Sequence, residues 1–197
     1  MSDPNKASDD HKFRELILFI SVRSEGDETF GATKLNKLLF FADYLAYRQL
    51  GKSITGQEYQ KLDNGPAPRK LLPITGDMQK SGDLAFSERQ YFGHAQRRSV
   101  ALRDPDLSCF SGEEIAIVCQ LIEFWHGKTA REISGASHHF PGWQLAETGE
   151  TIPYDAALVD LRKPTPDECA IGGELAPQLQ AMTKEFTEQY GEPQGNP

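Results

Sequence analysis

The sequence predicts a mainly α-helical fold of the α+β class, a compact helical domain with a small β-hairpin or short antiparallel sheet. Three observations favour it: apolar residues recur at helical spacing in several segments, two capping-box patterns precede such segments, and one stretch alternates as a hairpin does. With 197 residues the chain is long enough to bury a core, and we expect one domain with a tail.

The first two helices are expected near the N-terminus. Residues 1–8 are polar and are expected to be disordered. Phe13, Leu16 and Ile17 then begin an apolar pattern at helical spacing, which predicts a largely buried first helix. After a polar break, Thr33 is expected to cap a second helix that ends at Gly51, a residue suited to the left-handed C-cap.

The second predicted helix has two apolar faces. One side carries Leu35, Leu38, Leu39, Ala42, Leu45 and Ala46, and the other carries Phe40, Tyr44 and Tyr47. This pattern predicts a central helix that is buried on both sides. The alternative is that the aromatic stripe remains open as a groove for a partner.

The middle of the chain predicts a short strand, a turn at Asn64-Gly65-Pro66 and a helix entered through the prolines. Residues 83–103 fit a β-hairpin with its turn between Tyr91 and Arg98. The basic pair Arg97-Arg98 is therefore expected at a solvated loop tip.

Two capping boxes, Ser111 with Glu114 and Thr129 with Glu132, predict a long helix and then a short one. Pro153 is expected at the first position of a further helix, through about residue 161. The predicted division is therefore a disordered 1–8, a helical domain over 9–162, and a tail over 163–197 with a linker, an amphipathic helix and a disordered end. The stripe of that amphipathic helix is Leu175, Leu179, Met182 and Phe186.

Composition limits the function classes. A net charge of −8 and a pI near 5.1 oppose attraction to phosphate backbones, so DNA is not a favoured partner. A partner protein with a basic surface is favoured instead. Three widely spaced cysteines indicate neither a disulfide framework nor a zinc ribbon. The chain shows no signal peptide and no apolar run long enough for a membrane span, which predicts a cytoplasmic protein.

No motif in the sequence indicates catalysis or metal binding. His138 and His139 are neighbours, so their side chains diverge and do not easily share an ion. There is no nucleophile elbow and no glycine-rich phosphate loop. We therefore expect no enzyme, no catalytic residue, no metal site and no cofactor, with a metal-dependent enzyme assembled from distant residues as the lesser alternative.

The segments TKLNKLLFFADYLAYRQLGKSI, EYQKLDNGPAP and HHFPGWQLAETGETIP resemble, in this order, the Panacea domain of SocA-like antitoxins. The resemblance covers roughly residues 30–161. It includes a Lys-Leu-x-Lys-Leu helix start at 34–38, a Gly-Pro turn at 65–66, and a late His-Pro-Trp set at His139, Pro141 and Trp143. The doubled histidine and the FPG spacer depart from the family pattern.

The resemblance implies a mostly helical antitoxin that neutralises a co-encoded protein toxin by direct contact. One lineage instead acts as an adaptor that delivers its toxin to an ATP-dependent protease, and this alternative stays open here. The residues expected to bind the partner are Lys34, Lys37, Tyr44, Asn64, His139 and Trp143. Lys34 and Lys37 share a helical face and are expected to pair with acidic groups either within the protein or across the interface. Trp143 is expected to anchor its loop by packing, with an exposed interface role as the alternative.

Overall fold

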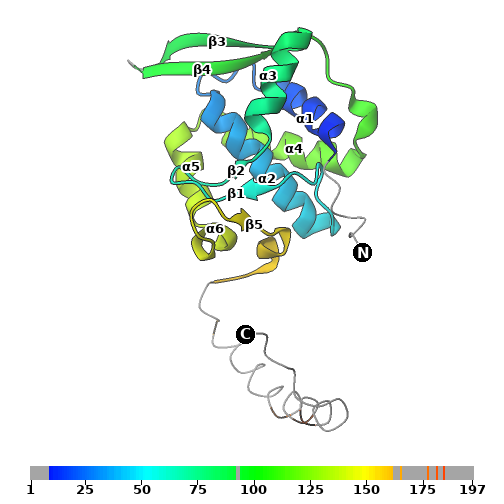
Figure 1. Cartoon of the computed structure of the whole chain (residues 1–197), viewed down its shortest axis with the longest axis vertical. Coiled ribbons are helices and arrows are strands. Elements are labelled where there is room, and N and C mark those ends of the chain that lie inside the picture. Colours follow the sequence, from blue (N-terminus) through cyan, green and yellow to red (C-terminus); the bar gives the residue numbers. More distant parts are fainter. Residues whose placement is uncertain are drawn as a thin grey trace. The chain divides into compact units, whose positions relative to one another are not determined.

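The structure is a computed structural model, and it describes residues 9–91, 94–161, 165, 177, 181 and 184. The chain divides into two compact units, Met1–Val159 and Asp160–Pro197 (Figure 1). The stripe predicted over 175–186 lies outside the described residues, and the predicted division of the tail stays a prediction. All the elements described below belong to the first unit.

The first unit is mainly helical, as predicted. Its helices are α1 (Asp10–Arg23), α2 (Ala32–Leu50), α3 (Leu71–Ser81), α4 (Gly112–Trp125), α5 (Ala130–His138) and α6 (Pro141–Leu145). Its strands are β1 (Tyr59–Gln60), β2 (Ala67–Pro68), β3 (Leu84–Tyr91), β4 (His94–Ala101) and β5 (Thr151–Ile152). No helix within the described residues combines the length and the apolar character that crossing a bilayer requires.

Helix α2 lies at the centre and is buried on both faces (Figure 1). One face packs with α1, α3 and α4 in the larger core cluster through Leu35, Leu38, Leu39, Ala42 and Ala46. The opposite face places Phe40 and Tyr44 in a second cluster with Tyr59 and Ile152. This confirms the prediction of a doubly buried helix, because the two apolar stripes contact two separate layers.

Of the two predicted ends of α2, the C-terminal one is confirmed and the N-terminal one is wrong. Gly51 adopts φ 73°, the left-handed C-cap that glycine permits without strain. The expected N-cap at Thr33 is wrong, because α2 already begins at Ala32 and Gly31 is its N-cap without a side-chain hydrogen bond. A Cβ at Gly31 would lie 2.9 Å from Gln96 Cγ, so contact with β4 favours glycine there.

Strands β3 and β4 form the predicted hairpin, which extends from the helical body in Figure 1. Pairing continues from Leu84↔Ala101 to Tyr91↔His94, so the connection is shorter than the turn expected between Tyr91 and Arg98. The expectation of a solvated Arg98 is also wrong. Its side chain is 4% exposed and donates to Ser24 O at 2.8 Å and to Asp27 O at 2.9 Å.

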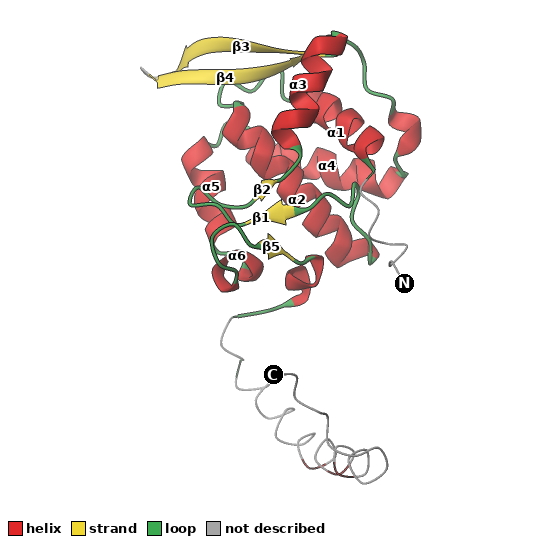
Figure 2. Cartoon of the chain, viewed as in Figure 1, coloured by secondary structure: helices red, strands yellow, loops and turns green. Residues whose placement is uncertain are grey.

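A small antiparallel sheet of order β2-β1-β5 lies among the helices (Figure 2). Strand β1 is the central strand, and its Tyr59 pairs with Pro68 on one side and with Ile152 on the other. The strand before the Asn-Gly-Pro turn was predicted. Strand β5 was not, because two residues give no periodic signal.

The capping boxes begin α4 and α5 as predicted, with both reciprocal hydrogen bonds present in each. The helix predicted after Pro153 is present as a shorter 3₁₀ helix, Tyr154–Leu158. Pro153 is its N-cap and not its first residue, and the backbone is extended again at Val159. Helix α6 occupies part of the segment that was expected to be a loop.

Candidate partner-binding site

The start of α2 is fixed by a buried ion pair. Lys34 Nζ donates to Asp27 Oδ2, to Thr29 Oγ1 at 2.7 Å and to Lys128 O at 2.9 Å. Burial alone would raise the pKa of Asp27, but the hydrogen bonds from Lys34 and Thr29 outweigh it and lower that pKa. Lys34 therefore pairs within the protein, and it connects the loop before α2 to the loop between α4 and α5.

Lys37 lies one turn further along α2 in a different environment. Its side chain is 1% exposed, and Nζ donates to Pro66 O at 2.8 Å. Burial lowers the pKa of Lys37 to about 8. Gly65 adopts φ 96°, and a Cβ there would lie 2.6 Å from Lys37 Nζ and 2.5 Å from Ser137 Oγ. Glycine at this turn therefore makes room for the ammonium group.

Lys37 lines a cavity of about 390 Å³ under the loop between β1 and β2, which we call the Lys37 pocket. Its other lining residues are Thr33, Asn36, Leu62, Asp63, Asn64, Gly65 and Thr148. Asn64 is exposed, and its carbonyl accepts a 2.8 Å hydrogen bond from Ser134 Oγ of α5. The predicted residues Lys37 and Asn64 are thus brought to one cavity.

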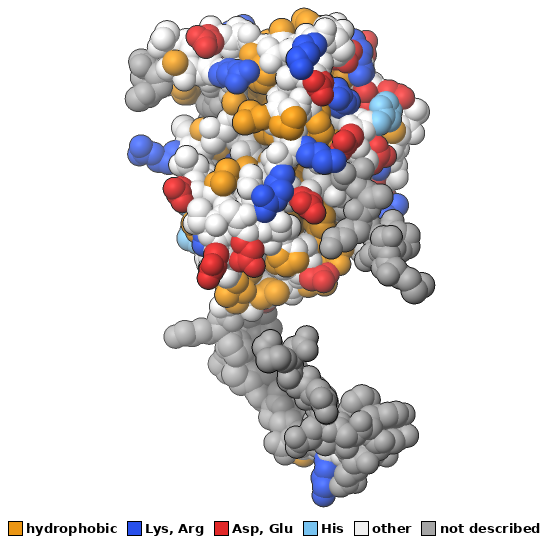
Figure 3. All heavy atoms as spheres, viewed as in Figure 1, with side chains coloured by type: hydrophobic (Ala, Val, Ile, Leu, Met, Phe, Trp, Pro, Cys, Tyr) orange, Lys and Arg blue, Asp and Glu red, His pale blue; other side chains and the backbone are white. Residues whose placement is uncertain are grey.

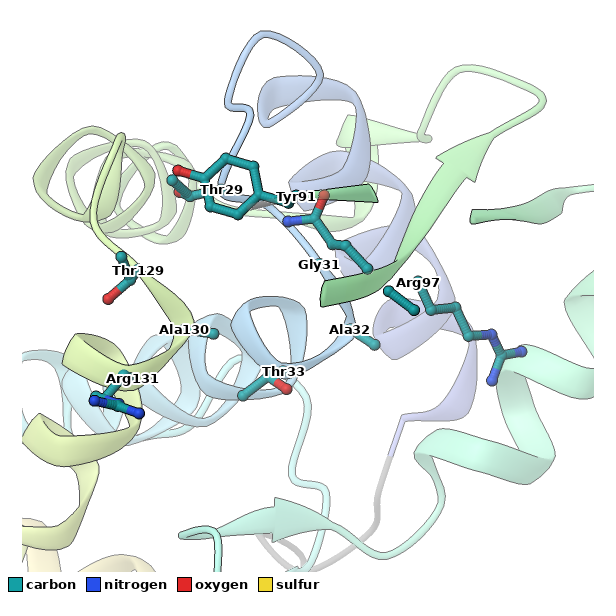
Figure 4. A pocket seen from close by; sticks show the side chains of 11 residues that line it. Thr29, Gly31, Ala32, Thr33, Tyr91, Arg97, Thr129, Ala130 and Arg131 are labelled. Atoms are coloured by element: carbon teal, nitrogen blue, oxygen red, sulfur yellow. The ribbon is translucent and has the colours of Figure 1, made fainter. Parts of the chain in front are cut away.

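A larger cleft of about 610 Å³ opens between the hairpin, the start of α2 and the start of α5 (Figure 4). Figure 4 shows Ala32 and Thr33 on α2, Ala130 and Arg131 on α5, and Arg97 on the hairpin side. Thr33 lines both this cleft and the Lys37 pocket, so the two hollows adjoin at the first turn of α2.

Trp143 holds the β1–β2 loop against α6. Its Nε1 donates to Leu62 O at 3.0 Å, the ring of His138 stacks on it at 4.2 Å, and Lys61 Nζ lies 4.5 Å from its ring centroid. The interpretation of Trp143 as a packed anchor agrees with these contacts. His138 is partly buried and His139 is exposed, so the two neighbouring histidines have different environments.

Tyr44 lies inside the second core cluster. Its side chain is 3% exposed, and its hydroxyl donates to Ile152 O at 2.6 Å. Burial raises the pKa of Tyr44 far above its ordinary range. The aromatic stripe of α2 is therefore occupied by neighbouring elements, and Phe40 packs edge to face with Tyr59 and Phe140.

Of the six residues predicted to bind a partner, Asn64 and His139 are exposed, Lys37 lines a cavity and Trp143 is partly buried. Lys34 and Tyr44 are enclosed by internal hydrogen bonds. Partner binding by each stays a prediction. Sequence reasoning missed Asn36 and Arg131, because no motif marks the polar lining of a hollow built from distant loops.

Among the described residues, no group of three or more His, Cys, Asp or Glu side chains is arranged to hold a metal ion. On the face shown in Figure 3, acidic and basic side chains are interspersed over the described part of the first unit.

Comparison with known proteins identifies the family. The family model described as antitoxin SocA-like, Panacea domain, matches residues 35–144, more than half of the 197 residues. No curated protein and no solved structure gives a significant match. The matched region begins in α2 and ends in α6, and it includes the Gly65-Pro66 turn, Trp143 and the lining residues of the Lys37 pocket other than Thr33 and Thr148. The chain therefore belongs to the SocA-like antitoxin family with a Panacea domain.

Proposed function

We propose that this protein is an antitoxin that neutralises a co-encoded protein toxin by direct contact, in the cytoplasm and without a cofactor or a catalytic step. The observation that carries the proposal is its membership of the SocA-like antitoxin family over residues 35–144. The physical features agree with a binding protein, because two adjoining hollows open where several loops meet.

The proposed contact surface is the first turn of α2 with the two hollows that share Thr33. The larger cleft carries two exposed arginines, Arg97 and Arg131, although the whole chain has a net charge of −8. Arginine is enriched at the energetic centres of protein interfaces. A toxin surface with acidic side chains would complement this cleft, so the charge proposed for the contact is opposite to the basic partner surface expected from the net charge of the whole chain.

Growth of a bacterial host tests the proposal. The gene next to this one is expressed alone and together with this chain, and colony formation is counted. We expect growth arrest from the neighbour alone, and growth restored by coexpression, with both proteins copurifying at a fixed ratio. A neighbour that leaves growth unchanged would contradict the antitoxin role.

Charge reversal locates the contact surface. Arg131→Glu should weaken copurification and growth rescue, because it places an acidic group in the cleft. Arg48→Glu is the matched control, because Arg48 is exposed near the opposite end of α2. The substitution changes the net charge by the same amount as Arg131→Glu does. Equal rescue by both variants would exclude the cleft from the interface.

A further inference from the structure

Lys34 and Lys37 differ in how completely their ammonium groups are satisfied. Both side chains are 1% exposed and both extend from the first turns of α2. Lys34 has a carboxylate, a hydroxyl and a carbonyl as acceptors. Within the described residues, Lys37 has one acceptor, Pro66 O, and no carboxylate partner. An ammonium group carries three donors, so Lys37 retains capacity for further acceptors.

The Lys37 pocket contains a second unsatisfied group. Asn36 Oδ1 is buried and has no hydrogen-bond partner among the described residues. Asn36 and Lys37 line the same cavity, so a residue with a cationic donor and a residue with a neutral acceptor lie beside one hollow. A buried polar atom without a partner destabilises the fold, so an occupant that satisfies both groups recovers that cost.

We propose that the Lys37 pocket receives a carboxylate of the partner polypeptide, with Lys37 as its counter-ion and Asn36 Oδ1 as the acceptor for an adjoining N–H. This inference rests on the proposed function for the identity of the partner, whereas the pocket chemistry rests on the described residues alone. The carboxylate comes either from the C-terminus of a polypeptide or from an Asp or Glu side chain, and the two sources present the N–H group differently.

The burial of Lys37 favours an anion of any kind, and two further features favour a carboxylate over other anions. Burial alone lowers the pKa of Lys37, so the ammonium gains from any negative charge that enters. A peptide carboxylate brings an N–H donor for Asn36 beside the charged group, whereas the O–H donor of inorganic phosphate is part of the charged group itself. Asp63 is the acidic residue among the described lining residues, and its charge opposes a dianion more than a monoanion.

Small probes test the pocket without the toxin. The full chain is prepared with ¹³C-labelled lysine, and the Cε resonance of Lys37 is followed at pH 7.5 in the presence of three compounds. N-acetylglycine imitates a C-terminus, N-acetylaspartate α-amide imitates a side-chain carboxylate, and N-acetylglycinamide has the same amide groups without the charge. We expect one or both carboxylates to move the resonance saturably and to raise its titration midpoint, and the uncharged amide to do neither.

Variants assign the effect to the pocket. Lys37→Met should abolish carboxylate binding, which for this variant is read from the backbone amide resonances of Gly65 and Thr148. Asn36→Asp should weaken carboxylate binding at least tenfold, because it places a negative charge beside the same cavity. This variant replaces Lys37→Met in the test if Lys37→Met does not fold. Asp63→Asn should strengthen binding about twofold by removing a like charge. Lys52→Met, at an exposed position, is the control and should bind as the wild type does.

The two proposals fail separately. The carboxylate site is overturned, whatever the toxin assay shows, if neither carboxylate shifts the Lys37 resonance. It is also overturned if N-acetylglycinamide shifts this resonance as much as the carboxylates do. Growth rescue that is unchanged by Lys37→Met and Asn36→Asp, with both variants folded, also overturns it while the antitoxin role stands. A carboxylate response in a chain that rescues no toxin would contradict the antitoxin role alone.

Discussion

Lys34 and Asp27 form an ion pair inside the protein, with side chains that are 1% and 4% exposed. Thr29 and the carbonyl of Lys128 complete the coordination of the ammonium group, and Gly127 N donates to Asp27 at 3.3 Å. Seven residues separate the two charges along the chain, and they belong to a loop and a helix. The pair thus connects three segments that the sequence shows only as separate elements.

Lys34→Met should destabilise the fold by about 3–5 kcal/mol, because it leaves the buried Asp27 carboxylate without its counter-ion. Urea unfolding followed by circular dichroism measures the change. Lys80→Met is the matched control, since Lys80 pairs with Asp77 at the surface, where an ion pair contributes about 0–1 kcal/mol. Similar losses from both substitutions would contradict a structural role for the buried pair.

Arg98→Ala should detach the hairpin from the loop that follows α1. The substitution removes a guanidinium group that donates hydrogen bonds to Ser24 O, Asp27 O and Glu25 O. Ser24 O and Asp27 O then keep one backbone donor each, from Asp27 N and Phe30 N. We expect a loss of about 2–4 kcal/mol and faster amide hydrogen exchange in β3 and β4. Arg97→Ala, at the exposed neighbouring position over the Phe86 ring, should change either quantity far less.

Gly65→Ala should cost more than Gly51→Ala, although both glycines have positive φ. At Gly51 nothing lies within 4 Å of an added Cβ, so the cost is the left-handed backbone alone, about 1–2 kcal/mol. At Gly65 the Cβ would also meet Lys37 Nζ and Ser137 Oγ. Thermal unfolding of the two variants compares the costs, and equal melting temperatures would show that the Lys37 pocket yields without strain.

Stability should depend on pH through Lys37. Its folded pKa of about 8 lies below the ordinary 10.5, so between these values the unfolded chain binds more protons than the folded chain. The unfolding free energy of the wild type should therefore rise from pH 8 to pH 10.5 relative to that of Lys37→Met. Below pH 8 the difference should be constant, because both states are then protonated.

Urea unfolding of both proteins at pH 7, 8, 9 and 10 supplies the measurement. Using the difference between the two proteins cancels the titration of the other lysines and the tyrosines. A difference that stays flat across this range would show that Lys37 keeps an ordinary pKa in the folded state.

Local signals in the sequence were sufficient for much of the architecture. The capping boxes at Ser111 and Thr129 and the C-cap at Gly51 satisfy backbone groups within a few residues, so neighbours along the chain determine them. The two stripes of α2 similarly predict burial on both sides. Local patterns failed where a distant contact prevailed, as at Gly31, which begins α2 against β4 in place of Thr33.

The candidate site was predictable only in part. Lys37, Asn64 and Trp143 come from a resemblance in motif, and the structure places them around one loop. No sequence motif marked the lining residues Asn36 and Arg131, because a hollow forms only when separate loops come together in the folded chain. Strand β5 and the buried Arg98 escaped prediction for the same reason, since their hydrogen-bond partners lie about 70 to 90 residues away.

The sequence by itself determined the helical class of this protein, the caps of α4 and α5, the double burial of α2 and the resemblance to SocA-like antitoxins. Only the tertiary structure decided which of two similar lysines is neutralised. Lys34 meets a carboxylate from a preceding loop, and Lys37 meets a single carbonyl beside a cavity. Helical spacing fixes the direction in which a side chain points, but the groups that it meets there are supplied by chain segments far away in sequence.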